Sequence, residues 1–301
     1  MKIRSNHIWY RKPFKLSLPK ISNYSQVEDF FTSNFNNGNA VLVSSGRAAI
    51  TMLIKLFWTS VTINIFKYAS QCVVNACIFS GVSPSTSVGT MEDIFYHQWG
   101  YPGSKKGGTI FIEDACDSFK PLGSKVRNLD SKFEIWSLSK ILGIRSGAII
   151  WCKNEVDAQK LKIFRDNKRR YNLKIFIKPL THLHPKIYTF WEYLELTNCS
   201  LNKFQVGAIY KEVINWENLH TTRHKLFKSK IRTLRQLGYQ GKIANENEIL
   251  SGTLLPAVLV GEDEIKGFSK NSIFLHRINL NPKPQIVRII PLSADLKNAH
   301  V

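Results

Sequence analysis

Short apolar runs alternate with segments of helical periodicity over the first half of the chain. Residues 40–43 are apolar, residues 44–46 (SSG) have turn chemistry, and residues 48–58 have helical spacing. A short strand followed by a helix is expected again over residues 64–81. This alternation predicts an α/β fold with a mainly parallel, doubly wound sheet, whose ligands bind at the carboxyl ends of the strands.

The same alternation continues toward residue 154. Residues 93–102 (DIFYHQWGYP) and 107–119 (GGTIFIEDACDSF) are each expected to contain a strand, the second with an acidic pair at its end. Residues 132–154 indicate a strand, a loop and a further strand, and Lys140 falls in that loop. The basic segment that follows is expected to be helical.

The pattern changes near residue 180. Residues 189–196 and 203–238 have helical spacing, the latter as one long or broken helix. Three short apolar segments near prolines are interpreted as strands, at 252–260, 272–280 and 285–292. We therefore predict three parts: an N-terminal arm (1–26) that leads into a short amphipathic helix, a large domain (27–178), and a smaller α+β domain (179–301).

The composition favours a globular protein over a disordered one, because 44% of the 301 residues are hydrophobic. No uncharged apolar run reaches the length of about 18 residues that a membrane span needs. The basic start lacks the apolar stretch of a secretory signal, so the cytoplasm is the expected location. Five cysteines at scattered spacings form no CxxC pair, and we expect neither a disulfide framework nor a metal site.

The net charge of +20 is the most unusual bulk property. Such a charge attracts polyanions, whether nucleic acid or phosphorylated small molecules. Basic residues concentrate in 160–178 and 224–235, where they fall on most faces of the expected helices, as on a solvated surface. General composition explains the charge better than a dedicated polyanion site, and no nucleic-acid module is recognisable.

Two motifs mark possible ligand contacts. Ser45, Gly46 and Arg47 stand between a strand and a helix, where the first N–H groups of the helix could hold a phosphate, although many α/β turns contain Ser-Gly. Asp114 in IEDACDS stands at the end of a buried strand, where a carboxylate needs a cation such as a protonated pyridine nitrogen. The alternative is that Glu113 or Asp114 caps the following helix.

A third motif is WSLSKILGIRSGAIIW, which contains Lys140. A lysine that forms a Schiff base must reach its neutral form, which partial burial and nearby cations promote. Ser137 and Ser139 could donate hydroxyl groups to a phosphate, and Gly143 and Gly147 would let the backbone turn close to a ligand. The alternative is an ordinary surface lysine.

Taken in order, SSGRAA, YASQCVVNA, YHQWGYP, IEDACDS, SLSK and SGAII resemble the DegT/DnrJ/EryC1/StrS family of sugar aminotransferases, which depend on pyridoxal 5'-phosphate (PLP). The resemblance covers roughly residues 27–238. It implies the type I PLP-transferase (aspartate-aminotransferase-like) fold, with a large domain built on a sheet of the seven-stranded type. It also implies a homodimer with shared active sites and nucleotide-sugar substrates.

The resemblance also implies roles for three residues near the cofactor ring. Lys140 would hold PLP through a Schiff base and then move protons between the substrate and the cofactor. Asp114 would pair with the pyridine nitrogen, and Asp117 matches the position that contacts the hydroxyl side of the ring. A related dehydratase branch has histidine in place of the lysine, so a lysine favours transamination.

The phosphate of the cofactor would be held by a second group of residues. By resemblance, Ser45 and the amides of Gly46 and Arg47 would form the phosphate cup together with Ser137. NCSLNKFQ resembles the NYRMSELQ segment of the family, so Asn198 matches the asparagine that reaches the phosphate in the neighbouring subunit.

The chain also departs from the family pattern. Ser70 stands where a flat side chain often stacks on the ring, so Tyr68 or Gln71 would have to substitute for it. The stretch 81–96 is short, which is expected to remove most of one helix–strand unit. His97 and Tyr68 are candidates for substrate contacts, although His97 is equally compatible with a structural role.

The sequence thus predicts an enzyme that moves an amino group from an amino acid such as glutamate to a nucleotide-linked keto-sugar. In the family's usual setting this reaction feeds surface-polysaccharide or O-antigen assembly. The alternative is a catalytically altered or silent relative that acts as a binding or regulatory protein. Nucleic-acid binding, which only the charge suggests, is the weakest of the three hypotheses.

Overall fold

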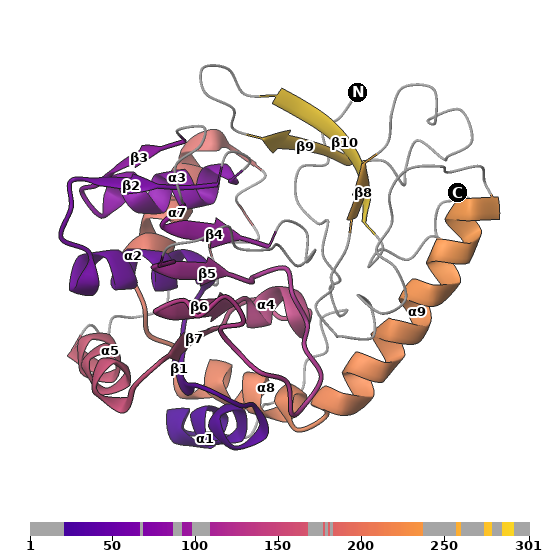
Figure 1. Cartoon of the computed structure of the whole chain (residues 1–301), viewed down its shortest axis with the longest axis horizontal. Coiled ribbons are helices and arrows are strands. Elements are labelled where there is room, and N and C mark those ends of the chain that lie inside the picture. Colours follow the sequence, from indigo (N-terminus) through magenta and orange to yellow (C-terminus); the bar gives the residue numbers. More distant parts are fainter. Residues whose placement is uncertain are drawn as a thin grey trace.

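The computed structural model has a central β-sheet with helices on both faces (Figure 1). It describes residues 21–66, 69–86, 92–97, 109–167, 177, 180, 183–236, 257–259, 274–278 and 285–291. Within these ranges, no helix combines the length and the apolar character needed to cross a membrane.

Five strands form the main sheet, in the order β1-β7-β6-β5-β4. Their bounds are Asn39–Val43 (β1), Ile94–Tyr96 (β4), Ile112–Asp114 (β5), Phe133–Trp136 (β6) and Ala148–Cys152 (β7). β4, β5 and β6 pair in parallel, whereas β7 runs antiparallel to both β6 and β1. β1 therefore points the same way as β4, β5 and β6, and the prediction of a mainly parallel sheet is confirmed.

A second, two-stranded sheet extends this layer. β2 (Thr62–Asn64) and β3 (Ser83–Ser85) pair in parallel, and a parallel bridge between Ile65 and Ile94 attaches them to the β4 edge. The two sheets together make the seven-stranded layer that the resemblance implies. The expectation that the short stretch 81–96 removes most of a helix–strand unit is wrong for the strands, because β3 and β4 both lie in it.

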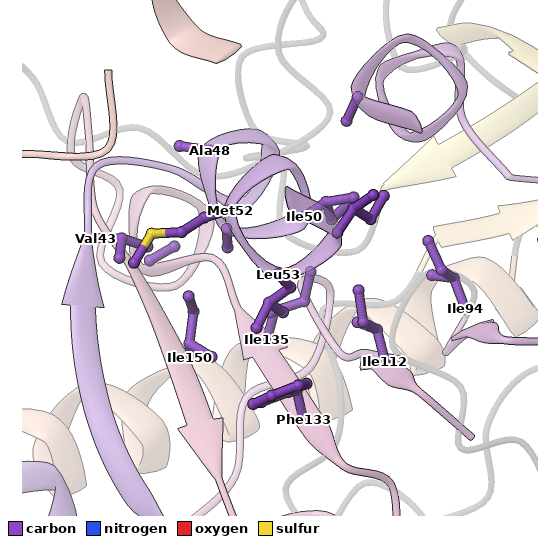
Figure 2. Close-up of a cluster of buried hydrophobic side chains, with 14 of the residues drawn as sticks. Val43, Ala48, Ile50, Met52, Leu53, Ile94, Ile112, Phe133, Ile135 and Ile150 are labelled. Atoms are coloured by element: carbon purple, nitrogen blue, oxygen red, sulfur yellow. The ribbon is translucent and has the colours of Figure 1, made fainter. Parts of the chain in front are cut away.

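One face of the sheet packs against α2 (Gly46–Phe57), α3 (Gln71–Phe79) and α5 (Glu155–Asn167). Because strand side chains alternate between faces, every second strand residue joins this cluster. Figure 2 shows α2 side chains such as Leu53 lying over strand residues such as Ile135. The start of α2 is thereby fixed above the carboxyl edge of the sheet.

The opposite face packs against α1 (Tyr24–Asn34), α8 (Lys203–Val213) and α9 (Trp216–Gln236). The helical segment predicted over residues 203–238 thus consists of two helices, α8 and α9. Five aromatic rings meet at this face and contact one another largely edge to face: Phe31, Phe35, Trp136, Trp151 and Trp216. Such pairs add about 0.5–1.5 kcal/mol each to the burial of their apolar area.

Lys140 lies on a helical turn and not in a loop, which corrects the expectation from the sequence. The turn, α4 (Leu138–Ile141), begins directly after β6. The backbone N–H of Ile141 donates to the Ser137 carbonyl (3.0 Å). Leu138 and Ile141 are both buried, and their spacing of three residues places them on one side of the turn.

The last strands form a sheet of their own, apart from the main sheet in Figure 1. β8 (Ala257–Leu259), β9 (Phe274–Ile278) and β10 (Gln285–Pro291) pair antiparallel in the order β8-β10-β9. The three strands expected in this part of the chain are confirmed. The division into an arm and two domains stays a prediction.

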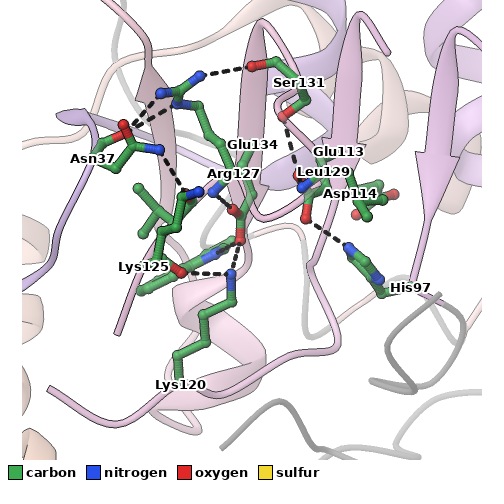
Figure 3. Close-up of polar contacts among 12 residues, drawn as sticks. Asn37, His97, Glu113, Asp114, Lys120, Lys125, Arg127, Leu129, Ser131 and Glu134 are labelled. Atoms are coloured by element: carbon green, nitrogen blue, oxygen red, sulfur yellow. Dashed lines mark hydrogen bonds and ion pairs between the residues drawn. The ribbon is translucent and has the colours of Figure 1, made fainter. Parts of the chain in front are cut away.

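Buried charges join β5 and β6 on the face that α1 and α8 cover. Glu113 and Glu134 lie opposite each other in the strand register, and both are fully buried. Glu134 accepts hydrogen bonds from Lys120 Nζ (2.9 Å) and Trp136 Nε1 (2.5 Å) (Figure 3). It also accepts one from the backbone N–H of Arg127. A buried charge with this many donors is stable only while the donors remain.

We expect Lys120→Ala to lower the free energy of unfolding by about 3–5 kcal/mol, because it leaves the buried Glu134 carboxylate without its cation. Lys153→Ala is the matched control, since Lys153 pairs with Asp130 at the surface and such pairs contribute little. Urea unfolding followed by circular dichroism measures both variants. Equal losses in the two variants would contradict the prediction.

Candidate active site

The carboxyl ends of β1, β4, β5 and β6 lie at one edge of the sheet, which is where α/β folds bind ligands. Hydrogen bonds draw distant segments to this edge. The Ser44 carbonyl accepts from the Gly147 N–H (2.7 Å), and Ser44 Oγ donates to the Asn198 carbonyl (2.5 Å). The Gly147 carbonyl accepts from the Ser139 N–H (3.1 Å). Segments of four different parts of the chain thus converge.

Lys140 and Asp117 form an ion pair at this edge. The distance from Lys140 Nζ to Asp117 Oδ1 is 2.5 Å. The Asp117 carboxylate is fully buried, whereas 30% of the Lys140 side chain is exposed. The second carboxylate oxygen of Asp117 accepts a hydrogen bond from the Tyr96 hydroxyl. The Lys140 side chain is thus partly exposed to solvent, while the carboxylate beside its amine is fixed from within the protein.

Asp114 ends β5 on the same face of the sheet, because it pairs with Tyr96 in the β4–β5 register. Its carboxylate accepts the Cys116 N–H (3.1 Å) and is nearly inaccessible to solvent. Burial raises the pKa of Asp114 above its ordinary value, and the Lys140 ammonium offsets this only in part. A buried carboxyl group of this kind stabilises a cation placed against it.

The charge balance at Lys140 differs from the sequence-based expectation. Burial lowers the pKa of Lys140, but the Asp117 carboxylate and the neighbouring Cys116 raise it, and the net direction is above the ordinary value. Nearby anions, and not cations, therefore decide the proton affinity of this amine. The sequence did not indicate this, because Asp117 and Lys140 are separated by a whole strand.

The turn after β1 offers N–H groups to the same edge. Ser45 caps α2, with its Oγ accepting from the Ala48 N–H (3.2 Å). The N–H groups of Gly46 and Arg47 belong to the first turn, where an α-helix has no acceptor of its own. A side chain at Gly46 would place its Cβ 2.9 Å from Cys116 Sγ, so only glycine lets α2 approach the Asp114–Asp117 segment this closely.

The side chain of Arg47 turns toward α7 (Pro185–Thr197), which packs on α2. Its guanidinium lies 4.8 Å from the Trp191 ring and donates to the Tyr188 hydroxyl (3.5 Å). Burial lowers the pKa of Arg47, but Cys72, Tyr188 and two glutamates of α7 raise it above the ordinary value. The expected contact of Arg47 with a phosphate therefore falls to its backbone N–H, while its side chain ties α2 to α7.

Two predicted serines also lie near this edge. Ser137 lies between β6 and α4, and its Oγ is 3.0 Å from Ser139 Oγ, so the two hydroxyl groups form one pair. Ser70 precedes α3, and its Oγ is 2.7 Å from Cys72 Sγ. Cys72 is close enough to influence the pKa of Lys140, which places the start of α3 beside the site. Their cofactor contacts stay predictions.

The other predicted residues are placed differently. His97 follows Tyr96, so its side chain points to the opposite face, where its Nε2 lies 2.8 Å from Glu113 (Figure 3). The structure does not bring it to Lys140. Asn198 is buried, and its Oδ1 accepts from Ser200 Oγ (3.0 Å) of the same chain. Tyr68 lies outside the described residues.

Tyr96 is the site residue that the sequence analysis missed. The alternation of the strand separates Tyr96 from His97, but the pairing of Tyr96 with Asp114 depends on strand register, which the sequence does not give. His97 drew attention for its chemistry, although it occupies the face of Glu113. The structural role that was the alternative for His97 is consistent with its buried hydrogen bond to Glu113.

A mainly parallel seven-stranded layer, with a lysine and two aspartates at its carboxyl edge, defines the type I class of PLP-dependent transferases. Over residues 27–284 the sequence matches the protein family described as "Putative PLP-dependent aminotransferase", and the chain belongs to this family. The comparison with curated proteins gives no match.

Solved structures agree with the class. A protein of Bacillus cereus ATCC 10987, described in the same words as the family, is 15% identical with a TM-score of 0.61, over 92% of this chain and 88% of that one. Helicobacter pylori PseC is 11% identical with a TM-score of 0.60, over 95% and 90%. A DegT/DnrJ/EryC1/StrS aminotransferase of Brucella abortus is 12% identical with a TM-score of 0.56, over 93% and 80%. At these identities the likeness concerns the fold.

The described residues fit PLP. The cofactor needs an amine for its aldehyde, an acid for its ring nitrogen and N–H donors for its phosphate. Lys140 supplies an amine on a partly exposed side chain, and Asp114 supplies a buried carboxyl group whose raised pKa indicates that it lacks full charge compensation. The start of α2 supplies the N–H groups, and glycine at position 46 lets α2 lie close to Cys116 in the Asp114–Asp117 segment.

We expect Gly46→Ala to weaken PLP binding about tenfold, or ~1.4 kcal/mol, because its Cβ would push Cys116 and the adjoining aspartates away from α2. Alanine is otherwise favoured over glycine in a helix. The double variant Gly46→Ala/Cys116→Ala removes the sulfur and should recover the wild-type affinity. PLP titration of both, with Cys116→Ala alone as control, tests this. If the double variant binds PLP as weakly as Gly46→Ala, the contact between the added Cβ and Cys116 is not the cause of the weaker binding.

Proposed function

We propose that this chain transfers an amino group from an amino acid, with glutamate as the first candidate, to a keto-sugar linked to a nucleotide. The observation that carries the proposal is the partly exposed Lys140 side chain, whose amine pairs with Asp117 at the carboxyl edge where the buried Asp114 also lies. The family supports aminotransfer. PseC, described as an aminotransferase involved in the biosynthesis of pseudoaminic acid, supports a sugar acceptor.

When bound, PLP supplies the electron-withdrawing ring and the aldehyde that amino-group transfer requires. Lys140 would hold it covalently, and its amine would then accept and return the proton of the substrate carbon. Asp114 would keep the ring nitrogen protonated, because a cation there compensates a carboxylate that burial makes costly. Gly46, Arg47 and Ser137 would bind the phosphate.

The charge and surface of the chain support the substrate class and the assembly. The net charge of +20 would attract an anionic nucleotide-sugar. We propose a homodimer with shared active sites, in which Asn198 reaches the phosphate of the partner. On α7, Phe190 and Tyr193 are about half exposed. Apolar side chains gathered in this way are typical of a covered surface. The cytoplasmic location and the role in polysaccharide assembly stay predictions.

We expect the purified protein to carry PLP and to show its visible absorbance band. Borohydride reduction should fix the cofactor on the peptide that contains Lys140. In Lys140→Ala both the band and the labelled peptide should be lost, because the amine is the covalent attachment point. Absorbance spectra and peptide mass spectrometry measure the outcome.

Lys153→Ala is the control, since its exposed side chain lies at a surface ion pair. A colourless wild-type protein that takes up no added PLP would contradict the enzyme hypothesis. That result favours the silent relative, for which the small Ser70 at the ring-stacking position is the supporting feature.

We expect Asp114→Asn to retain PLP but to slow amino-group transfer by about 10²–10³-fold, because the neutral amide no longer stabilises a protonated ring nitrogen. Stopped-flow absorbance with glutamate measures the first half-reaction. A panel of nucleotide keto-sugars, with the free sugars as controls, measures the second. Equal rates with free and nucleotide-linked sugars would reject the proposed substrate class, whereas an unchanged rate in Asp114→Asn would reject the role of Asp114.

A further inference from the structure

The Asp117 carboxylate is shared between two groups that come from different elements. Its Oδ1 lies 2.5 Å from Lys140 Nζ on α4, and its Oδ2 accepts the hydroxyl hydrogen of Tyr96 at the end of β4. The carboxylate is fully buried, so both oxygens are fixed by protein groups. Tyr96 itself is held by its backbone in the sheet and packs its ring against Phe66.

Other titratable groups face the Lys140 amine from the surrounding elements. Asp114 approaches from the end of β5, Cys116 from the segment that follows it, and Cys72 from α3. On the α9 side, Arg223 Nη1 lies 3.5 Å from the Lys140 carbonyl oxygen. The Asp117 carboxylate oxygen is in direct contact with the Lys140 amine.

We propose that Asp117, oriented by the Tyr96 hydroxyl, controls the proton on the Lys140 amine, which makes Tyr96 a positioning residue of the active site. This inference rests on the proposed role of Lys140. An amine reacts with an aldehyde only in its neutral form, and the Asp117 carboxylate in contact with the Lys140 amine favours its charged form. Tyr96 keeps that carboxylate from rotating away, because a charge-assisted hydrogen bond has strict geometry.

The position of the pair has a measurable consequence. A carboxylate 2.5 Å away favours the charged amine, so Lys140 should become neutral only at a higher pH than an exposed lysine. Removing the carboxylate charge should lower the pH at which Lys140 becomes neutral, because the largest opposition to the effect of burial is then lost. At a fixed pH below the midpoint, each pH unit by which the midpoint falls raises the neutral fraction of the Lys140 amine about tenfold.

The test is competitive labelling of lysines with a trace of acetic anhydride, over a range of pH, on the full chain after removal of bound cofactor. Mass spectrometry reports Lys140 relative to the exposed Lys203. In the wild type, the labelling midpoint of Lys140 should lie above that of Lys203. In Asp117→Asn it should fall by at least about one pH unit, which raises Lys140 labelling at pH 8 about tenfold or more.

Tyr96→Phe should give a midpoint between those of the wild type and Asp117→Asn. An unchanged or higher midpoint would show that Tyr96 does not position the carboxylate. Asp130→Asn changes an exposed carboxylate and should leave Lys140 labelling as in the wild type. Circular dichroism excludes variants that have lost their fold.

The wild-type comparison does not depend on any variant. A Lys140 midpoint at or below that of Lys203 overturns the inference, even if PLP binds at Lys140. Conversely, a raised midpoint in a chain that takes up no PLP leaves the Asp117–Lys140 pairing intact and rejects the proposed function alone. The two failures are therefore distinguishable.

Discussion

Two consecutive buried carboxylates at the end of β5 need charge compensation from the surrounding structure. Glu113 and Asp114 point to opposite faces of the sheet, and each has lost the water that would stabilise its charge. Burial raises the pKa of Glu113, but His97, Lys120 and the Leu129 N–H bring it below its ordinary value. The pKa of Asp114 stays raised. The charge of Glu113 is therefore compensated by protein groups. The Asp114 carboxylate can still pair with a cationic group of a ligand.

The two faces of β5 therefore differ in role. The groups around Glu113 support the strand, and the candidate site lies on the face of Asp114. On the face of Glu113, the buried pair of Lys120 and Glu134 and the Arg127 side chain connect β5 and β6 to the loops below the sheet. On the face of Asp114 lie the turn before α2, Lys140 and Asp117. The network on the face of Glu113 keeps Asp114 in place from the opposite side of the strand. Functional sites need support of this kind, because small displacements of a reacting group are costly.

The sequence predicted what depends on local pattern and failed where contacts are long-range. The alternation of strands and helices correctly predicted β1, α2 and β5, because hydrophobic period and turn residues are local signals. The short α4 and β3 were missed, since neither has a periodic pattern of its own. The Asp117–Lys140 pair and the side of the sheet that His97 faces follow from strand register, which sequence spacing does not give.

The candidate site also depends on segments from both halves of the chain. The turn at Ser44 is held by Asn198 and Cys199, and the Arg47 side chain is held by α7. The start of α2 is therefore fixed by residues that follow position 180. A phosphate cup made of backbone N–H groups has no side chains to adjust, so its fit depends on where the whole helix begins. The packing of α7 and the 198–200 segment is for this reason part of the chemistry of the site, although none of these side chains needs to touch the reacting atoms.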